Sequence, residues 1–317
     1  MTLSRRTIVK AGALGALSLV AKAPVFAQES KAVKMFKCLG CGHLGVDANQ
    51  KQAVDYAAQF GFDAVEAHLG DLEKMSRAQR ADFLGSMQSK KVRWGTCGLP
   101  VEFRRDEETF QKGIQAFPGQ AALLKEIGVT GVVTWIMPGT NELTYLENFR
   151  QHARRLREAA KILKDVDLRL GLEFVGSQTL RNQFRYPFAH TQKEMLELCD
   201  EIGTGNMGLL FDSYHWFTSR GTVEEILALK PEQIVLVHIN DARQGRSRDE
   251  QIDGERALPT ATGVIDLKTF MNALVQIGYD GPVVIEPFDN ELRAMDNEPA
   301  LQKTIDAMNA AFALIEA

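Results

Sequence analysis

Residues 169–175 read Arg-Leu-Gly-Leu-Glu-Phe-Val, a short apolar run that carries one carboxylate near its end. Such a run predicts a buried strand. The preceding residues 143–164 predict a helix with one buried face, because apolar residues recur in them every three or four positions. Those apolar positions are Leu146, Phe149, Ala153, Leu156, Ala160 and Leu163. A helix that leads into a buried strand is the repeating unit of an α/β fold.

The same alternation of β-rich runs and amphipathic stretches occurs eight times from Val33 onward. The predicted strands are residues 33–39, 64–68, 92–97, 131–137, 169–175, 207–211, 234–239 and 282–286. No glycine-rich nucleotide fingerprint follows the first strand, so the pattern predicts a single closed (β/α)8 TIM barrel rather than a doubly wound sheet. We expect one domain over residues 31–317, because α/β barrels commonly reach this length.

Residues 1–27 are set apart from the barrel. They contain Arg5-Arg6, then an apolar run over residues 11–21, and end in Pro24-Val25-Phe26-Ala27. This order resembles a Tat-type export signal. The apolar run is well short of the roughly 20 residues that span a bilayer. We therefore expect recognition by the Tat export machinery, cleavage after Ala27, a periplasmic location and no membrane span in the mature protein.

Composition argues against a nucleic-acid partner, because the 317 residues carry a net charge of −4 and the basic residues are scattered. The chain has four cysteines, two of them in a Cys38-x-x-Cys41 motif. That motif leaves a disulfide, a redox pair or plain thiols open, but no second pair is present to complete a zinc site. We expect the cysteines to be structural.

Catalytic groups in such barrels lie at the carboxyl ends of the strands. The fifth to eighth predicted strands end in, or lead directly into, Glu173, Asp212, His238 and Glu286. Three carboxylates that meet at one mouth would repel each other, and their pKa values would rise. A divalent cation removes this conflict. Three oxygen ligands and one imidazole suit Mn²⁺ or Mg²⁺, while Co²⁺ and Zn²⁺ stay open.

Further polar and aromatic side chains are expected near the same mouth. His215 could hydrogen-bond a substrate oxygen or pack inside the protein, and Arg256 could hold an oxygen or a negative group or form a surface ion pair. Trp135 could be an apolar wall for a sugar ring or a buried barrel residue. The remaining pocket candidates are His43, Glu66 and His68. Arg256 lies in a long connection, residues 241–264, and loops of this length are usually functional or disordered.

The order Glu-Asp-His-Glu over four successive strands, with the Asp212-x-x-His215 pair, resembles the xylose-isomerase-like TIM barrels. The resemblance covers roughly residues 33–316. Residues 172–176, 256–259 and 263–266 look like the members called sugar phosphate isomerases/epimerases. The resemblance implies that Glu173, Asp212, His238 and Glu286 bind the metal. It also implies that Glu173 and Glu286 move a carbon-bound proton through a metal-stabilised enediolate.

The expected activity is a sugar isomerase or epimerase that acts on a sugar or an oxidised (keto) sugar. The alternative is a lyase or dehydratase acting on a keto-sugar, keto-glycoside or inosose-like substrate. Two departures from the family weaken a free-ketose epimerase. Thr179 stands where ketose 3-epimerases carry a glutamate, and residues 259–263 replace the usual Pro-Gly-Glu-Gly. Export weakens a phosphosugar substrate, since sugar phosphates are mainly cytoplasmic.

Two other classes fit less well. A DNA repair nuclease like endonuclease IV would need a multi-zinc cluster rich in histidine, and the chain has only six histidines. A non-catalytic sugar-binding protein would have no need of convergent carboxylates. The sequence leaves open whether the protein forms a homo-oligomer.

Overall fold

The computed structural model describes residues 33–316. Eight parallel strands close into a barrel in the order β1-β10-β9-β8-β6-β4-β3-β2, so strands that are consecutive in this set along the chain are neighbours. These strands are β1 Phe36–Leu39, β2 Ala64–Ala67, β3 Arg93–Gly98, β4 Gly131–Ile136, β6 Arg169–Phe174, β8 Met207–Asp212, β9 Ile234–Ile239 and β10 Pro282–Ile285. The predicted TIM barrel is confirmed, and the predicted strands match these within a few residues at each end.

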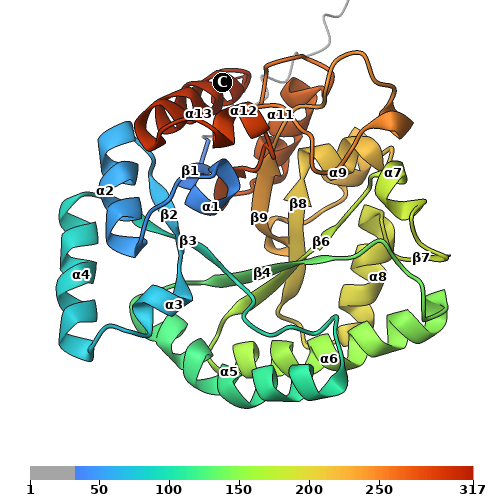
Figure 1. Ribbon diagram of the computed structural model, residues 1–317, viewed down its shortest axis with the longest axis horizontal. Coiled ribbons are helices and arrows are strands. Elements are labelled where there is room, and N and C mark those ends of the chain that lie inside the picture. The colour runs from blue at the N-terminus through green and yellow to red at the C-terminus, as the bar shows by residue number, and fades with distance from the viewer. Residues whose placement is uncertain (1–32, 317) are drawn as a thin grey trace, which may run out of the picture. The chain divides into compact units, whose positions relative to one another are not determined.

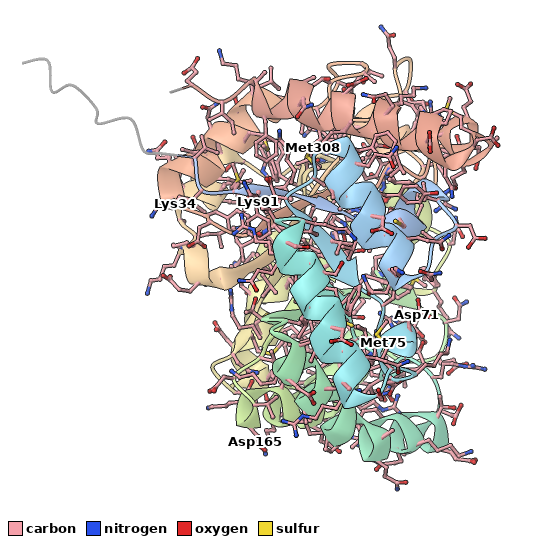
Figure 2. All side chains as sticks on the ribbon, turned by 90° about the vertical axis from the view of Figure 1, so that its left-hand side faces the viewer. Lys34, Asp71, Met75, Lys91, Asp165 and Met308 are labelled. Atoms are coloured by element: carbon pink, nitrogen blue, oxygen red, sulfur yellow. The ribbon has the colours of Figure 1, made fainter. Side chains whose placement is uncertain are left out.

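Helices form a ring outside the strands (Figure 1). The longer helices are α2 Gln50–Phe60, α4 Arg77–Ser89, α5 Glu107–Ile127, α6 Tyr145–Asp165, α8 Gln192–Ile202, α11 Leu267–Ile277 and α13 Asn297–Phe312. The shorter ones are α1 Cys41–Leu44, α3 Leu69–Leu72, α7 Gln178–Arg181, α9 Ser213–Thr218, α10 Val223–Leu227, α12 Asn290–Arg293, and the 3₁₀ turns η1 Pro231–Gln233 and η2 Arg248–Glu250. In the view turned by 90°, α4 faces the viewer, with Lys91 labelled at its upper end and Met75 beside its lower part (Figure 2).

The helix α6 shows how sequence sets these boundaries. Its start is fixed by Thr144, whose backbone N–H and hydroxyl both donate to the Glu147 carboxylate, at 2.9 and 2.6 Å. This contact satisfies groups that the first turn would otherwise leave unpaired. A further antiparallel pair, β5 Gly139–Thr140 with β7 Tyr186–Pro187, lies outside the barrel sheet and was not predicted.

Apolar side chains fill both the barrel interior and the layer between strands and helices. The interior cluster consists of Phe36, Cys38, Ala64, Val133, Leu210, Val235, Leu236 and Val284. Gly171 lies in this interior, where an added Cβ would come within 2.9 Å of the Val235 Cβ and 3.1 Å of the Val133 Cγ1. A larger residue there would disturb the packing directly below Glu173.

All four cysteines are buried free thiols. Burial raises the pKa of the Cys41, Cys97 and Cys199 thiols to about 12. Reactive cysteines need the thiolate form. The thiols therefore have the character of structural residues, as expected. Among the described residues, no helix combines the length and apolarity needed to cross a bilayer.

Candidate metal centre

The barrel brings four side chains of metal-ligating types to one point at the carboxyl ends of its strands. Glu173 comes from β6, Asp212 ends β8, His238 comes from β9 and Glu286 directly follows β10. Asp212 and His238 are direct register partners. All four are buried, and their ligand atoms lie within 4.8 Å of one another. The group predicted from the strand ends therefore converges as expected.

Several atoms of this group lack a hydrogen-bond partner. The Nδ1 atom of His238 lies 3.3 Å from Glu286 Oε2 and 3.8 Å from Glu173 Oε1. Yet both ring nitrogens of His238 and the Oε1 atom of Glu173 are buried without a hydrogen bond from any described residue. Buried polar atoms are normally paired. Unpaired imidazole and carboxylate atoms that face one point fit a divalent cation.

The two glutamates of this group have opposite electrostatic surroundings. Burial raises the pKa of Glu173 well above its usual range, and the charges of Glu286 and Asp212 raise it further. Burial also acts to raise the pKa of Glu286, but His238 and His43 outweigh it and hold this pKa well below its usual range. Without a bound ion, Glu173 thus favours its protonated form and Glu286 its charged form.

Arg256 lies inside the site rather than on the surface. Its side chain is only 1% exposed, and its Nη1 atom donates to Asp212 Oδ2 at 2.7 Å and to Glu286 Oε2 at 3.0 Å. The surface ion pair considered from the sequence is therefore wrong. The expectation of wholly uncompensated carboxylates is wrong too, because the guanidinium already supplies one positive charge beside them.

The long connection over residues 241–264 carries Arg256 into the site. The buried Asp241 carboxylate accepts hydrogen bonds from the backbone N–H groups of Thr262, Gly263 and Ile265, at 2.9, 2.7 and 3.0 Å. The backbones of Asp241 and Ala257 also pair with each other. These contacts close the connection at its base.

Three residues of the site were missed by the sequence analysis. The side-chain amide of Asn240 donates to both Asp212 oxygens, and its carbonyl accepts from the backbone N–H of Glu286. Asp253 accepts from Arg256 Nη2 at 3.0 Å. Asp241 is the third. The one available signal was that Asn240 and Asp241 directly follow the strand that carries His238.

His215 is buried between the backbone and the charged group. Its Nδ1 accepts a hydrogen bond from the backbone N–H of Gly176, and its Nε2 lies 3.1 Å from Arg256 Nη2 and 3.8 Å from Glu173 Oε1. Burial lowers the pKa of His215, and the charge of Arg256 lowers it further. The ring is therefore neutral, with one nitrogen fixed by the backbone and the other facing the site.

On the opposite side of the group, His43 connects two carboxylates. Its Nδ1 lies 2.9 Å from Glu286 Oε1 and its Nε2 lies 3.2 Å from Glu66 Oε2. Burial lowers the pKa of His43, but Glu66 and Glu286 outweigh burial and raise it well above the usual range. His43 and Glu66 therefore lie beside the four-residue group.

The other two candidates differ from each other. Trp135 is 41% exposed, so the buried barrel tryptophan considered from the sequence is wrong. Its register partner is Glu173, and paired residues project to the same side of a sheet. The Arg104 guanidinium lies 4.2 Å from its ring. His68 directly precedes α3, and no hydrogen bond or ion pair in the described part of the chain ties its ring to the four-residue group.

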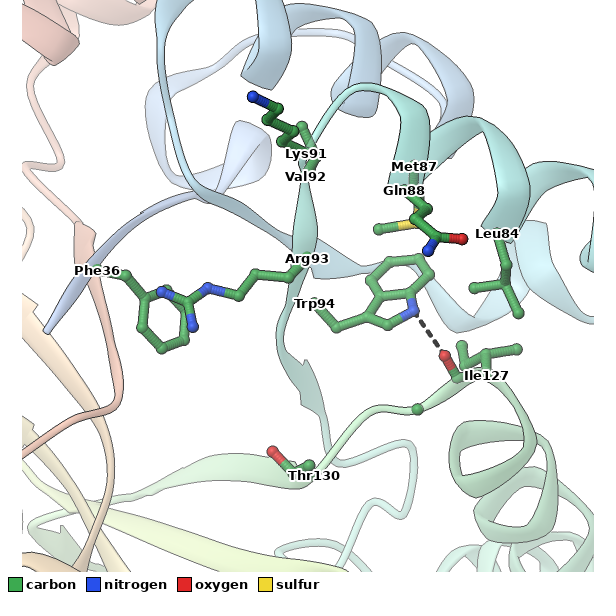
Figure 3. Close-up of a pocket in the computed structure, with 11 residues that line it drawn as sticks. Phe36, Leu84, Met87, Gln88, Lys91, Val92, Arg93, Trp94, Ile127 and Thr130 are labelled. Carbon is green, nitrogen blue, oxygen red and sulfur yellow. Dashed lines mark hydrogen bonds between the residues drawn. The ribbon is translucent and has the colours of Figure 1, made fainter. Parts of the chain in front are cut away.

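A separate hollow of about 640 Å³ lies among the amino ends of the strands, away from this group. Phe36 and Arg93, the first residues of β1 and β3, contribute to its lining, and Trp94 donates from its indole to the Ile127 carbonyl at 2.9 Å (Figure 3). Its lining contains no carboxylate and no imidazole. It therefore offers no carboxylate or imidazole ligand for a metal ion.

The structure thus defines a TIM barrel with a group of acidic and histidine side chains at its mouth. The chain belongs to the xylose isomerase-like TIM barrel family, whose model matches residues 54–311. It is 30% identical to a xylose isomerase domain protein from Alicyclobacillus acidocaldarius, with a TM-score of 0.78 over 88% of this chain and 99% of the other. It shares the fold of IOLI protein, described with a binding zinc atom, at 22% identity and a TM-score of 0.74, over 89% of this chain and 100% of that one.

Two curated relatives are named as sugar or inosose isomerising enzymes. An inosose isomerase of Bacillus velezensis is 24% identical over 282 residues, which is 86% of this chain and 96% of the relative. An L-ribulose 3-epimerase of Methylomonas sp. is 24% identical over 263 residues, which is 81% of this chain and 84% of the relative.

Proposed function

We propose that this protein is a divalent-metal-dependent isomerase or epimerase of a sugar or an oxidised (keto) sugar. The observation that carries the proposal is the convergence of the carboxylates of Glu173 and Glu286 on one point shared with Asp212 and His238. The relatives named as inosose isomerase and L-ribulose 3-epimerase support the same class.

The proposed ligands are Glu173, Asp212, His238 and Glu286, and the proposed ion is Mn²⁺ or Mg²⁺. The binding zinc atom of the IOLI protein, which shares this fold, supports a divalent ion here. A bound ion would stabilise the negative charge that develops on substrate oxygens when a carbon-bound proton leaves. Metal ligands are deprotonated, so with the ion bound Glu173 and Glu286 would both be carboxylates, one to remove the carbon-bound proton and the other to return it.

The polar side chains around this group would orient the substrate. His215 Nε2 lies 3.1 Å from Arg256 Nη2 and 3.7 Å from Asp253 Oδ1, so these three side chains form one polar cluster beside the group. Trp135, exposed on the same side of the sheet as Glu173, would form an apolar wall for the sugar ring. The hydroxyl of Thr179 donates to the Gln251 carbonyl at 2.7 Å, so that position supplies no carboxylate.

Isotope exchange tests this proposal. The metal-loaded protein is incubated in D₂O with a panel of sugars and 3-keto sugars, and the products are examined by NMR and mass spectrometry. We expect one carbon-bound position to acquire deuterium in a product that is otherwise an isomer of its substrate. Tight binding without exchange in any sugar would contradict the enzyme and favour a binding protein.

The second candidate function is a lyase or dehydratase, which uses the same first proton transfer. It is favoured by Thr179, because the glutamate of ketose 3-epimerases is missing at that position. The same experiment separates the two functions, since a lyase product has lost water or an aglycone while an isomer keeps its mass.

We also propose that the protein is exported to the periplasm through the Tat pathway. The supporting residues 1–27 lie outside the described part of the chain. Changing Arg5→Lys and Arg6→Lys together is expected to stop export, because the Tat signal is read through its paired arginines. Cell fractionation measures this, with the exposed Arg77→Lys as the control. Folded double variant in the periplasm would contradict the proposal.

A further inference from the structure

The two oxygens of the Glu286 carboxylate have different partners. Oε2 faces the four-residue group, at 3.0 Å from Arg256 Nη1 and 3.3 Å from His238 Nδ1. Oε1 lies 2.9 Å from His43 Nδ1. One oxygen is therefore directed at the proposed metal, while the other is held by a histidine that is not part of the four-residue group.

His43 is itself held on its other edge. Its Nε2 lies 3.2 Å from Glu66 Oε2, so both ring nitrogens face carboxylate oxygens. Glu66, His43 and Glu286 form a continuous row across the place where the first and last strands of the barrel meet. The row joins residues 243 positions apart in sequence, from His43 to Glu286.

The backbone is shaped to hold this row. A Cβ on Gly40 would come within 2.5 Å of His43 Cδ2 and 2.8 Å of Glu66 Oε2, so only glycine leaves room for the pair. The fully buried Gln50 donates to the Glu66 backbone carbonyl at 3.1 Å and accepts from the backbone N–H of His68. The backbone on both sides of the Glu66–Ala67 segment is thus held by a buried side chain.

We propose that His43 and Glu66 are positioning residues, which orient the Glu286 carboxylate toward the metal, rather than substrate-binding residues. The inference rests on the proposed role of Glu286 as a metal ligand. A ligating carboxylate whose second oxygen is hydrogen-bonded is restrained in one orientation, and such partners typically contribute about 10- to 100-fold to metal affinity.

Mn²⁺ binding to the full mature chain tests this role without knowledge of the substrate. His43→Ala is expected to raise the Mn²⁺ Kd about 10- to 100-fold, measured by titration calorimetry. His43→Asn is expected to recover most of the affinity, because its amide can donate from nearly the position of Nδ1. His43→Gln places its amide nearer to Nε2 and is expected to stay weak. Glu66→Gln is expected to weaken binding less than His43→Ala.

The matched control is His190→Asn. The His190 side chain is 26% exposed against 25% for His43, and its Nδ1 lies 3.3 Å from Glu194, outside the row. It should bind Mn²⁺ with the wild-type Kd. A purely structural role for His43 would make the Asn and Gln variants equal, and spectra of each variant report whether it is folded.

Three results would overturn the inference. The first is a folded His43→Ala variant that binds Mn²⁺ with the wild-type Kd. This result would contradict the role of His43 but not the proposed metal site. Another is binding of two ions by the wild type and one by His43→Ala. That result would make His43, Glu66 and His238, whose ligand atoms also lie within 4.8 Å of one another, a second cation site. The last is no Mn²⁺ binding by the wild type, which would remove the proposed metal function as well.

Discussion

Replacing Glu173 or Glu286 by glutamine is expected to abolish turnover in either variant. Glutamine nearly keeps the shape of the side chain, but its amide can neither take nor give the proton. General acid–base groups typically contribute about 10²- to 10⁴-fold to the rate, and each glutamate is also a proposed ligand. We therefore expect a loss of kcat of at least about this size in each variant.

The measurement needs the metal content of each variant, because a lost ligand and a lost proton carrier give the same loss of turnover. Rates are compared at saturating Mn²⁺, with bound metal determined on the same samples. Glu197→Gln is the matched control, since Glu197 is exposed on α8 and should leave the rate unchanged. A metal-loaded Glu173→Gln or Glu286→Gln protein with the wild-type rate would disprove the proton-transfer role of that residue.

The fold was predictable because each main strand and helix has a recognisable pattern in its own stretch of sequence. A run such as residues 169–175 is apolar enough to be a buried strand, and α6 has its apolar residues on one face. The four candidate ligands were predictable for a related reason. Each closes an apolar strand, where a carboxylate or imidazole is costly unless it has a function, and parallel strands bring their ends together.

The contacts between these residues and their neighbours were not predictable. Arg256 reaches Asp212 only because Asp241 closes a long irregular connection, and nothing periodic in residues 241–264 indicates that path. His43 reaches Glu286 only because the barrel closes. The exposure of Trp135 depends on whether neighbouring loops cover it, and the pair β5–β7 is too short to leave a pattern.

Removing the divalent ion is expected to abolish activity and to lower the melting temperature. An ion that binds only the folded protein adds stability of about 2.7 kcal/mol at a concentration 100-fold above its Kd. Added Mn²⁺ should therefore raise the melting temperature of chelator-treated protein. Arg256 reduces the repulsion in the metal-free state, so that state should remain folded rather than collapse.

Two ligand variants sharpen this test. His238→Ala removes the only imidazole of the four-residue group, and Asp212→Asn removes a charge while nearly preserving shape. Both should reduce the rise in melting temperature that Mn²⁺ causes. Lys230→Ala, at an exposed position, should show the full rise.

The size of the rise should also depend on pH. The pKa of Glu173 is raised in the folded metal-free protein, mainly by burial. Its protonated form therefore stabilises the fold below the ordinary glutamate pKa, and this stability is lost as pH increases through the raised value. A bound ion neutralises the carboxylate instead of a proton, so the Mn²⁺-induced rise should grow with pH over that range. The contrary result is a melting temperature that is the same with Mn²⁺ and with chelator across that pH range, in the wild type and in both ligand variants. It would contradict the proposed metal site.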